Sequence, residues 1–475
     1  MDCLIGLDIG TSAVKGILIS EDGEILAQGK EKTSFVYPNP DYVEFDAEER
    51  YKLICTFIRS LVQQKPLSSR IRAISISGAS GNSLLLDKNK NPVQNVASWL
   101  DMRAESSYQE LLSSFSDEYV YSVCGWPRIG SFPLAYYAWM KKNKPEIYNS
   151  SPYKVTDFIY FNFKLTGCWN HDASTATNFY LQDQIQQIYH QPFLDFLGID
   201  KNTLPKIINT GEKIGKITCQ ASDETGLPTD AVVVAGSFDH PSAARGTGMF
   251  HCGDLLISCG TSWVGFYPVS NREMAYKQKM LIDPFLSPEG PWGCMFSIPN
   301  IGSAINQYVE GLFENAPDRF DKLDSAASQS PLGANNLFID ITQTEYSPEE
   351  HLLQFKNHTE SDISRAIMES MSFVMRKKIE HFRNEGLVTI KISMVGGPSE
   401  SKIWPKILTD VLGLPIELIK GEYAGCLGAS IIAGVGVDLF KNEIDGFERL
   451  RIKPVVIQPD LKNTERYSQI LKNNN

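Results

Sequence analysis

The alternation of apolar and polar positions in the first 80 residues predicts short strands, a helix and a buried strand. Apolar or alternating runs at 4–8, 13–20 and 24–29 predict a meander of three strands separated by turn residues. Apolar residues recur four positions apart over 47–64, which predicts a helix. The apolar run at 71–77 predicts a buried strand, and a glycine-rich turn follows it.

The rest of the chain continues this mixture of elements. Helical patterns dominate to about residue 200, and a short β-branched strand is predicted at 231–235. Helices are predicted at 302–313 and 361–382, and a strand is predicted at 390–395. Because strands and helices interleave in both halves, the predicted fold class is α/β.

The length of 475 residues predicts two domains, since one hydrophobic core rarely serves so long a chain. We place them at residues 1–245 and 246–475, with Gly246 and Gly248 as a candidate hinge. The segment after about residue 445 is rich in Lys and Asn, and we expect it to be a solvated polar tail.

Composition and charge narrow the class of protein. The chain is 42% hydrophobic and 21% charged, as is typical of soluble globular proteins, and its formal net charge of −11 argues against broad binding to nucleic acid. No apolar stretch approaches the ~18 residues that cross a bilayer, and the N-terminus lacks the basic region of a signal peptide. The nine cysteines form no Cys-x-x-Cys pair. We therefore expect a cytoplasmic protein with reduced thiols and no membrane or nucleic-acid partner.

A turn that occurs twice gives the first chemical signal. Residues 4–12 read LIGLDIGTS and residues 255–262 read LLISCGTS, so an apolar run ends in Gly-Thr-Ser in each half. Such turns let backbone N–H groups approach phosphate oxygens closely, and two of them could hold a polyphosphate. Ordinary β-turns are the alternative, because the same residue types favour turns. The candidate phosphate-binding residues are Gly10, Thr11, Ser12, Gly260 and Thr261.

Asp8 ends the first predicted strand, beside the first of these turns. A carboxylate there would repel phosphate unless Mg²⁺ lay between them, and Mg²⁺ prefers one or two carboxylates together with waters and phosphates. Lys15 could add a positive charge to the same pocket. Alternatively, Asp8 only caps its own turn and Lys15 is solvated.

Asp239 follows the predicted strand at 231–235, near the expected domain junction. Pockets occur preferentially at domain interfaces, and a carboxylate there can accept the proton of a substrate hydroxyl group. A helix N-cap is the alternative role for Asp239. His240 could donate to or accept from a sugar hydroxyl, or it could be structural.

Three further segments are ambiguous by themselves. Asp101 and Arg103 could bracket a polyol, or they could pair with each other at the surface, a contact that contributes little. Gly396 and Gly397 follow the strand predicted at 390–395 and would let a flat ring lie on the backbone. The small residues at 425–429 open an apolar helix, and we interpret them as close packing.

Six motifs, taken in order, resemble the FGGY carbohydrate kinases and the xylulokinase-like branch in particular. They are LIGLDIGTS at the start, WLDMR near 100, GSFDHPSAARGTG at 236–248, ISCGTS at 257–262, GSAINQY at 302–308 and VGGPSESKIWPKILTDVLGLPIEL at 395–418. The similarity spans about residues 1–440. Each motif is weak singly, but their joint occurrence in this order is highly specific.

The resemblance implies two ribonuclease H-like domains of the actin/hexokinase superfamily, with ATP in the cleft between them and closure over sugar and nucleotide. It implies transfer of the γ-phosphoryl group of Mg·ATP to a hydroxyl of a sugar or polyol, with a pentulose such as xylulose as the expected acceptor. We also consider a homodimer as the assembly.

The resemblance also implies roles for individual residues. Asp239 matches the catalytic base and Asp8 matches the Mg²⁺-associated aspartate. The residues that match ATP contacts are Gly10, Thr11, Ser12, Lys15, Gly260, Thr261, Gly302, Asn306, Gly396, Gly397 and Ser401. The residues expected on the substrate side are Ser80, Gly81, Asn82, Asp101, Arg103, Asp239 and His240.

Three departures from the xylulokinase pattern gather on the sugar side. Ala79-Ser80-Gly81 stands where xylulokinases carry Gln-Met-His, so the histidine that touches the ketose is missing. His240 stands where the family usually has Asn or Gln, and a Gly-Glu-Arg-Thr-Pro-like loop is replaced by 338–342. These changes leave the acceptor open: gluconate, a hexulose or a polyol is the alternative to xylulose.

Two functions of other classes compete with a kinase. A catalytically silent relative could bind sugar or ATP as a regulator, but it would have no need of the base Asp239. A chaperone-like ATPase of the same superfamily would need a substrate-binding β-domain after the nucleotide fold, and the sequence after residue 440 is too short for one.

Overall fold

The computed structural model describes residues 1–286, 290–343, 347–419 and 422–473, and it divides into two compact units. The first unit consists of Met1–Phe250, Ser270–Cys294 and Tyr423–Arg451, and the second of His251–Val269, Met295–Glu422 and Ile452–Asn475. The chain therefore first changes unit close to the boundary expected at 245/246, and it returns twice to the first unit after that point.

The first unit is built on a six-stranded sheet with the order β13-β14-β5-β1-β2-β3. Its strands are β1 (Asp2–Ile9), β2 (Ala13–Ser20), β3 (Ile25–Lys32), β5 (Arg70–Gly78), β13 (Lys213–Lys216) and β14 (Val232–Val234). The antiparallel meander of β1, β2 and β3 confirms the pattern read from the first 30 residues, and β5 and β14 are parallel to β1.

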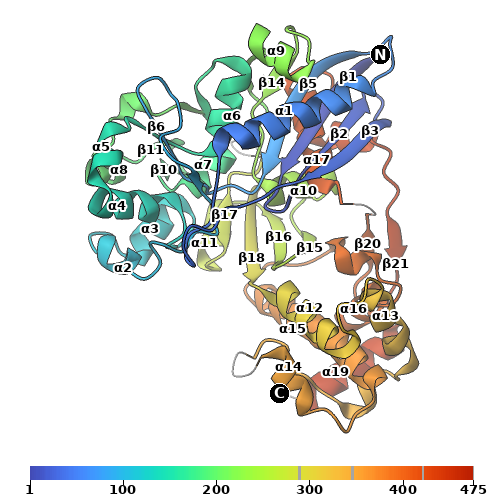
Figure 1. The fold of residues 1–475 in the computed structure, drawn as a ribbon. Coiled ribbons are helices and arrows are strands. Elements are labelled where there is room, and N and C mark those ends of the chain that lie inside the picture. The colour runs from blue at the N-terminus through green and yellow to red at the C-terminus, as the bar shows by residue number, and fades with distance from the viewer. Residues whose placement is uncertain (287–289, 344–346, 420–421, 474–475) are drawn as a thin grey trace. The chain divides into compact units, whose positions relative to one another are not determined.

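Two helices cover opposite faces of this sheet (Figure 1). A Cβ atom on Gly16 would lie 2.7 Å from a ring carbon of Phe57 in α1 (Ala47–Gln63), so this face meets α1. A Cβ atom on Gly6 would lie 2.0 Å from the carbonyl oxygen of Cys426 in α17 (Ala424–Gly436). Gly16 pairs with Leu7, the neighbour of Gly6, and neighbours in a strand point to opposite faces. The helix α17 thus belongs to the first unit although it lies late in the sequence.

Close packing explains the small residues of α17. A Cβ atom on Gly428 would lie 1.8 Å from the carbonyl oxygen of Ser242 in α10 (Asp239–Gly246), and one on Gly246 would lie 2.0 Å from that of Ala424. These approaches allow no side chain, because the partner in each case is backbone. The packing interpretation of residues 425–429 is confirmed.

Helices and short strand pairs form the remainder of the first unit, as the helical patterns up to residue 200 predict. The helices are α2 (Tyr108–Leu111), α3 (Asp117–Cys124), α4 (Pro133–Asn143), α5 (Pro145–Ser150), α6 (Asp157–Thr166), α7 (Ala173–Phe179), α8 (Gln191–Leu197), α9 (Cys219–Thr225), α11 (Arg272–Lys277) and α18 (Glu443–Arg449). The paired short strands are β4 (Glu44–Phe45) with β7 (Val96–Ala97), β6 (Leu84–Leu86) with β8 (Tyr153–Val155), β9 (Asn170–Asp172) with β12 (Lys206–Ile208), and β10 (Gln182–Asp183) with β11 (Ile188–Tyr189).

The second sheet repeats the strand order of the first. It has seven strands in the order β17-β18-β16-β15-β19-β20-β21, with β15, β16, β19, β20 and β21 in the second unit. The strands are β15 (Asp254–Cys259), β16 (Trp263–Val269), β17 (Leu281–Asp283), β18 (Trp292–Ile298), β19 (Lys391–Gly396), β20 (Ile416–Leu418) and β21 (Val455–Ile457). The run β18-β16-β15-β19-β20 corresponds to β3-β2-β1-β5-β14, so both sheets have the strand order 3-2-1-4-5.

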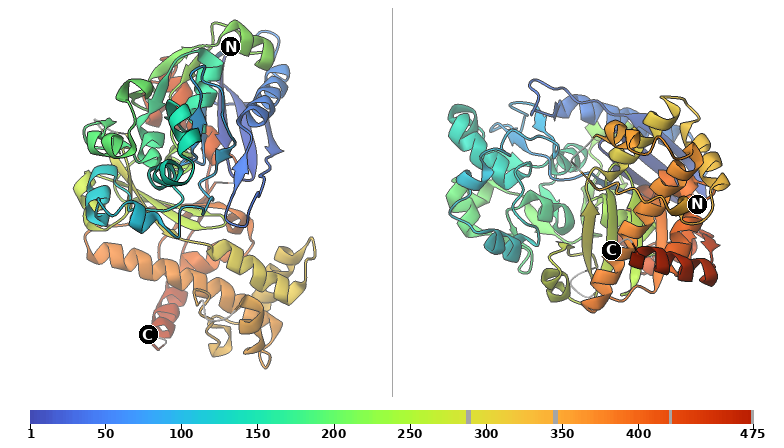
Figure 2. Two further views of the ribbon diagram at one scale, coloured as in Figure 1. Left: turned by 60° about the vertical axis from the view of Figure 1, so that its left-hand side comes forward. Right: turned by 90° about the horizontal axis from the view of Figure 1, so that it is seen from below.

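The helices of the second unit confirm the predictions at 302–313 and 361–382. They are α12 (Ile301–Phe313), α13 (Arg319–Gln329), α14 (Pro348–Leu353), α15 (Glu360–Asn384), α16 (Trp404–Leu412) and α19 (Leu461–Asn473). The C-terminal helix α19, dark red in Figure 2, lies against the orange helices of this unit, and its packing partner there is α16.

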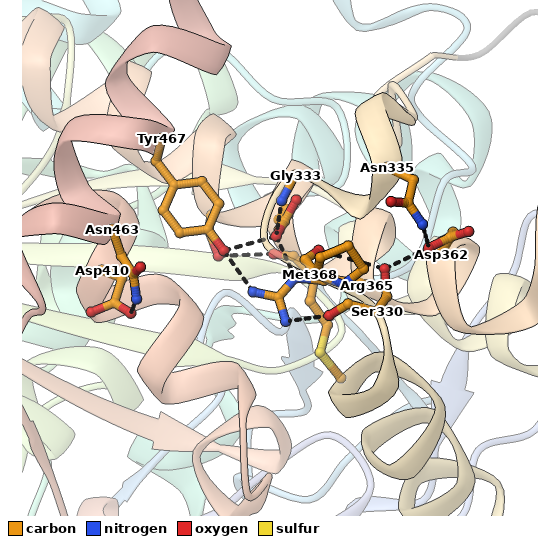
Figure 3. A network of polar contacts seen from close by, with 12 residues as sticks. Ser330, Gly333, Asn335, Asp362, Arg365, Met368, Asp410, Asn463 and Tyr467 are labelled. Atoms are coloured by element: carbon orange, nitrogen blue, oxygen red, sulfur yellow. Dashed lines mark hydrogen bonds and ion pairs between the residues drawn. The ribbon is translucent and has the colours of Figure 1, made fainter.

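The segment after residue 445 is not a solvated tail, which corrects the expectation from composition. It contributes β21 to the second sheet, and Tyr467 in α19 is only 1% exposed. The Tyr467 hydroxyl donates to Glu369 Oε1 at 2.7 Å, and Arg365 Nη2 donates to that hydroxyl at 3.0 Å (Figure 3). Apolar Tyr467 and Leu471 lie four apart on one face of the helix and are both buried, which the abundance of Lys and Asn around them conceals.

We expect Tyr467→Phe to lower the free energy of unfolding by about 1–2 kcal/mol, because Arg365 Nη2 loses its hydrogen-bond acceptor and the buried Glu369 carboxylate loses one of its donors. Urea unfolding followed by circular dichroism measures the change. Tyr37→Phe is the matched control, since Tyr37 is 66% exposed. Equal stabilities of the two variants would contradict the docking of α19 through this network.

No helix in the described ranges has both the length and the apolar content that a bilayer span requires.

Candidate active site

The first sheet brings three functional segments of the sequence to one edge. The parallel strands β1 and β5 end side by side, with Ile9 paired to Gly78, and Gly78 forms a bridge with Phe238. The turn after β1, the loop after β5 and the start of α10 therefore lie next to one another. Ligands of α/β proteins bind at the carboxyl ends of parallel strands, and this edge is such a place.

The Asp8 carboxylate lies in an environment that is unfavourable for a negative charge. Its Oδ1 oxygen is shielded from solvent and has no hydrogen-bond partner among the described residues. Burial and the negative charge of Asp239 together raise the pKa of Asp8 to about 6, against the opposing effect of Lys15, the cross-strand partner of Asp8. The sheet thus brings together the predicted metal ligand, the predicted base and Lys15.

These residues fit the donor set that Mg²⁺ prefers in proteins. An unpartnered buried carboxylate oxygen beside a second carboxylate is a site that a cation would stabilise. The described residues contain no cluster of three or more His, Cys, Asp or Glu that could hold a metal by themselves. Mg²⁺ usually keeps waters and phosphate oxygens as its remaining ligands, so one or two carboxylates suffice.

We expect Asp8→Asn to stabilise the protein in the absence of divalent cations. The pKa of Asp8 is raised from 3.8 to about 6, so the folded state binds more protons than the unfolded state between these values. Stability is therefore lost as the pH rises through this window, and the asparagine variant avoids the loss. After allowance for partial exposure, the gain at pH 7.5 is about 1–2 kcal/mol.

Urea unfolding at pH 7.5 and pH 3.5 measures this effect: the variant is more stable at the higher pH, and the difference vanishes at the lower one. Added Mg²⁺ should raise the thermal midpoint of the wild type but not that of Asp8→Asn. Asp195→Asn, a change at an exposed carboxylate, is the control. If the stability of the wild type and of the variant depended on pH in the same way, the raised pKa of Asp8 would be contradicted.

Asp239 is the first residue of α10, and its side chain is 39% exposed. The N-cap position of α10 is held by Phe238, without a side-chain capping bond, so Asp239 does not fill the N-cap role that the sequence left open. Its Oδ1 accepts the backbone N–H of His240 at 2.8 Å, and the imidazole Nε2 of His240 is 4.0 Å from the same oxygen. Asp239 is therefore accessible to a ligand.

Two residues that sequence reasoning missed fix the backbone in front of Asp239. The Phe238 N–H donates to Ser174 Oγ at 3.3 Å, and Ser174 Oγ donates to Asp283 Oδ2 at 2.7 Å. Asp283 is fully buried, which raises its pKa to about 7. No local pattern could have identified this pair, since its members are 109 positions apart and neither of them lies in a motif.

The loop after β5 places its polar side chains inward. Ser80 Oγ donates to Asn178 Oδ1 at 2.9 Å, and Asn82 Nδ2 donates to Asp157 Oδ2 at 2.9 Å. Asn82 Oδ1 accepts the backbone N–H of Trp99 at 2.9 Å. Ser80, Gly81 and Asn82 thus follow the carboxyl end of β5, and Asn82 ties the loop to the segment that contains Trp99.

Asp101 and Arg103 form an ion pair with each other. Arg103 Nε and Nη2 donate to the two oxygens of Asp101 at 2.7 and 2.8 Å, and Nη2 also donates to Glu44 at 2.5 Å. This is one of the alternatives that the sequence left open, except that the pair is buried rather than at the surface, with Asp101 2% exposed. A role of these residues in substrate binding stays a prediction.

The first Gly-Thr-Ser turn is tight, with the Gly10 N–H donating to the carbonyl oxygen of Ala13 at 2.9 Å. Thr11 Oγ1 accepts the indole N–H of Trp99 at 3.2 Å, and Ser12 is exposed. The turn therefore presents backbone and a hydroxyl group beside Asp8.

The second unit holds the corresponding turn and the remaining predicted nucleotide contacts. The Gly302 N–H donates to the carbonyl oxygen of Thr261 at 2.8 Å, and a Cβ atom on Gly302 would lie 2.0 Å from the carbonyl oxygen of Gly260. Gly396 has a φ angle of +99°, and a Cβ atom there would lie 2.4 Å from the carbonyl oxygen of Cys259. Glycine is thus required at 302 and 396 by the backbone of the second turn itself.

An apolar cavity of about 300 Å³ lies beside this turn, within the second unit. Gly397 borders it, and a Cβ atom on Gly397 would meet nothing within 4 Å. Of the predicted ATP contacts, Gly260, Gly302, Gly397 and Ser401 line this cavity. Sequence reasoning missed most of the apolar lining, which includes Trp263, Ile305, Pro317, Phe320, Leu323, Pro398 and Trp404. Three of these, Pro317, Phe320 and Leu323, lie in or next to α13, a helix that the sequence pattern did not predict.

Two predicted contacts are already engaged within the second unit. Asn306 donates to Glu310 Oε1 at 2.8 Å and accepts from Arg319 Nη2 at 3.1 Å. Asn306 borders a second cavity, of about 460 Å³, together with Gly260, Thr261 and Gly302. Ser401 Oγ donates to Asp324 Oδ1 at 2.6 Å.

Comparison with known proteins identifies the family of the chain. The model of the N-terminal domain of the FGGY family of carbohydrate kinases matches residues 3–246, and the model of the C-terminal domain matches residues 255–437. A xylulose kinase of Staphylococcus epidermidis is 25% identical over 478 residues, covering 98% of this chain and 95% of that protein.

Solved structures show the same fold. The xylulose kinase of Rhodospirillum rubrum superposes with a TM-score of 0.88 at 22% identity, covering 99% of this chain and 97% of that chain. The gluconate kinase of Lactobacillus acidophilus superposes with a TM-score of 0.85 at 20% identity, covering 99% of this chain and 96% of that chain. Two family models account for most of the sequence, and the fold is that of these kinases. The chain therefore belongs to the FGGY family of carbohydrate kinases and is a sugar kinase.

Proposed function

We propose that this sugar kinase transfers the γ-phosphoryl group of ATP to a hydroxyl group of a neutral ketose of pentulose type, with Mg²⁺ as the metal ion. The observation that carries the proposal is the proximity of the Asp8 and Asp239 carboxylates at the sheet edge, beside a Gly-Thr-Ser turn. A partly exposed carboxylate for a proton, a buried carboxylate for a cation and backbone N–H groups for phosphate are the components that phosphoryl transfer requires.

Asp239 is the general base of the proposed reaction. As the acceptor oxygen forms its bond to the γ-phosphorus atom, the bond from that phosphorus to the β,γ-bridging oxygen breaks and ADP leaves. The proton of the acceptor hydroxyl moves to a carboxylate oxygen of Asp239. The bond from Phe238 N–H to Ser174 Oγ holds the backbone of the base in place during this step.

Asp8 is the residue that would hold Mg²⁺, and Lys15 lies opposite it in the hairpin. When bound, Mg²⁺ neutralises charge on the phosphate oxygens. The turn Gly10-Thr11-Ser12 presents its backbone to the same phosphates.

The second unit supplies the proposed nucleotide site. A cavity of about 300 Å³ with aromatic and aliphatic walls suits a flat base, and Gly397 leaves one wall as bare backbone. Gly260 borders both cavities and Thr261 borders the larger one, so this turn would bind phosphate oxygens of the nucleotide.

Two observations support the choice of acceptor: the names of the relatives and the contacts of Arg103. The Staphylococcus protein that covers most of this chain is named a xylulose kinase. Gluconate is the second candidate, because a gluconate kinase shares the fold. A carboxylate substrate calls for an available cation, and Arg103, the guanidinium that the sequence placed near the sugar, already binds Asp101 and Glu44. Because Arg103 is already neutralised by these carboxylates, a neutral ketose is favoured over gluconate.

A panel of pentuloses, hexuloses, polyols and aldonates, screened by ADP release with Mg·ATP, tests the proposal. We expect ADP formation that depends on a ketose and on Mg²⁺. Binding of sugar and ATP without turnover would instead indicate a silent regulator. A cytoplasmic location and a homodimeric assembly both stay predictions.

A further inference from the structure

A further cavity of the second unit is separate from the proposed nucleotide site. It has a volume of about 750 Å³ and is lined by the end of β18, the segment 338–342 and one face of α15. None of its lining residues borders either of the two cavities beside Gly260. No residue of the proposed reaction lines it, so phosphoryl transfer leaves this cavity unexplained.

One face of α15 brings positive charge to this cavity. Its lining residues recur three or four positions apart and are Ser370, Phe373, Val374, Lys377, Lys378 and His381. Lys377 and Lys378 are exposed, and neither forms an ion pair with another residue of the described ranges. Glu380, the acidic residue that follows them in the helix, binds Arg376 at 2.8 Å instead. Two unpaired ammonium groups in one cavity repel each other, so an anion bound there would stabilise this face.

The segment 338–342 adds an aromatic ring to the wall. The Phe338 ring is 37% exposed and stacks against Phe373, with the ring centroids 6.5 Å apart and an interplanar angle of 25°. The Ser370 hydroxyl donates to the carbonyl oxygen of Ile339, which joins the segment to α15. The cavity therefore presents a supported aromatic face together with the two lysines.

Oxygen atoms complete the lining. Asp340 Oδ1 accepts the backbone N–H of Thr342 at 2.9 Å and the Thr342 hydroxyl at 2.6 Å, so the carboxylate is held in place by its own segment. Ser297, near the end of β18, adds an exposed hydroxyl group. Hydroxyl and carboxylate oxygens form hydrogen bonds with the hydroxyl groups of a sugar, whereas an aromatic face packs against its C–H groups.

We propose that this cavity binds a sugar phosphate, at a site distinct from the catalytic one. Lys377 and Lys378 bind the phosphate group as point charges, and the carbon skeleton packs on Phe338. Asp340 is the one acidic residue among the described lining residues, so the two lysines leave an excess of positive charge for the anion. A sugar phosphate is also the class of product that a sugar kinase releases. The proposal concerns binding alone and does not depend on Asp239 as the base.

Binding of sugar phosphates and of their separate halves tests the proposal on the wild-type protein without ATP. Isothermal titration uses D-xylulose 5-phosphate and D-fructose 6-phosphate, with inorganic phosphate and D-xylulose as the halves. We expect at least one sugar phosphate to bind about 10-fold more tightly than inorganic phosphate, because it also gains the contact with Phe338. Equal affinities for inorganic phosphate and both sugar phosphates would overturn the assignment of the ligand as a sugar.

Hydrogen exchange followed by mass spectrometry shows where the sugar phosphate binds. Protection is expected in peptides that cover 337–343 and 370–382. A sugar phosphate could also bind as product near Asp8 and Asp239, and exchange in those segments reports that event separately. Protection confined to the segments around Asp8 and Asp239 would overturn the proposal.

Variants then test the two lysines. Lys377→Ser combined with Lys378→Ser should weaken binding by about 10-fold or more and remove the protection of 370–382, whereas arginine at both positions should preserve them. Lys356→Ser combined with Arg383→Ser is the matched control, because it removes two exposed positive charges of the same unit that do not line the cavity. Undiminished binding and protection in the serine variant would contradict the role of the lysines.

Phe338→Ala separates the two parts of the ligand. It should weaken binding of the sugar phosphate but leave binding of inorganic phosphate unchanged, because only the carbon skeleton packs on the ring. An equal loss for both ligands would mean that the substitution had disturbed the cavity as a whole, and it would contradict the assigned role of Phe338.

Failure of the proposed function has a different signature. The lysine variants keep Asp8, Asp239 and the nucleotide cavity, so initial rates of ADP release should match those of the wild type. A protein that binds the sugar phosphate at α15 but transfers no phosphoryl group to any acceptor would contradict the proposed function alone. A working kinase without protection of α15 would contradict the assignment of this cavity alone.

Discussion

Replacement of Asp239 by Asn is expected to lower kcat by about 10²–10⁴-fold, with KM for ATP within about threefold of the wild type. The amide has nearly the same shape as the carboxylate but cannot accept the proton of the acceptor hydroxyl. Asp239 begins α10 without serving as its N-cap, so its replacement should leave the helix intact. Coupled ADP release at saturating acceptor measures kcat.

Two controls make the Asp239 result specific. Asp195→Asn removes an exposed carboxylate from the same unit and should leave kcat unchanged. Far-ultraviolet circular dichroism and the thermal midpoint show whether Asp239→Asn is folded. A folded variant with near-wild-type turnover would mean that another group accepts the proton.

Substitution of two adjacent glycines of the second unit is expected to change two different properties, nucleotide binding for one and stability for the other. Gly397→Leu should raise KM for ATP by about 10–100-fold at an unchanged thermal midpoint, because its Cβ enters open space that belongs to the nucleotide cavity. Gly396→Ala should lower the thermal midpoint by several degrees, because its Cβ meets the backbone of Cys259 at a φ angle of +99°. Isothermal titration with ADP and differential scanning calorimetry separate the two effects.

The pair of variants tests the location of the nucleotide site independently of catalysis. Gly386→Ala provides a further comparison for Gly396→Ala, since Gly386 has a φ angle of +95° but no atom within 4 Å of its Cβ position. It reports the cost of the backbone angle alone. If Gly397→Leu bound ADP as tightly as the wild type, the apolar cavity would not be the base pocket.

Much of the fold could be predicted from the sequence because local patterns determine it. The strands at 4–8 and 13–20 and the helix at 47–64 have strong periodicities, and the structure has β1, β2 and α1 there. The return of the chain to the first unit could not be predicted from such patterns. Only the structure shows that α17 packs against β1 and α10, since this contact joins segments about 180 and 420 positions apart and depends on backbone approach at Gly6 and Gly428.

The candidate site divides in the same manner. Asp8 and Asp239 could be selected from sequence because Asp8 lies at the end of one strand and Asp239 comes after another, and parallel strands bring such positions together. The pair of Ser174 and Asp283 behind Asp239 could not, because neither residue lies in a motif and they are 109 positions apart. The prediction of a solvated tail after residue 445 failed for a related reason. The segment is polar in composition, and its few apolar residues are the ones that pack against the second unit.

The most direct test of phosphoryl transfer at the Asp8–Asp239 edge is the identity of the product. The protein is incubated with Mg·ATP and a reacting ketose, and ³¹P nuclear magnetic resonance follows the phosphorus. The predicted result is one phosphate monoester of the sugar for each ADP formed, with both lost in Asp239→Asn. Formation of ADP with inorganic phosphate and no sugar phosphate would contradict the proposed mechanism. So would formation of the sugar phosphate by Asp239→Asn at the wild-type rate.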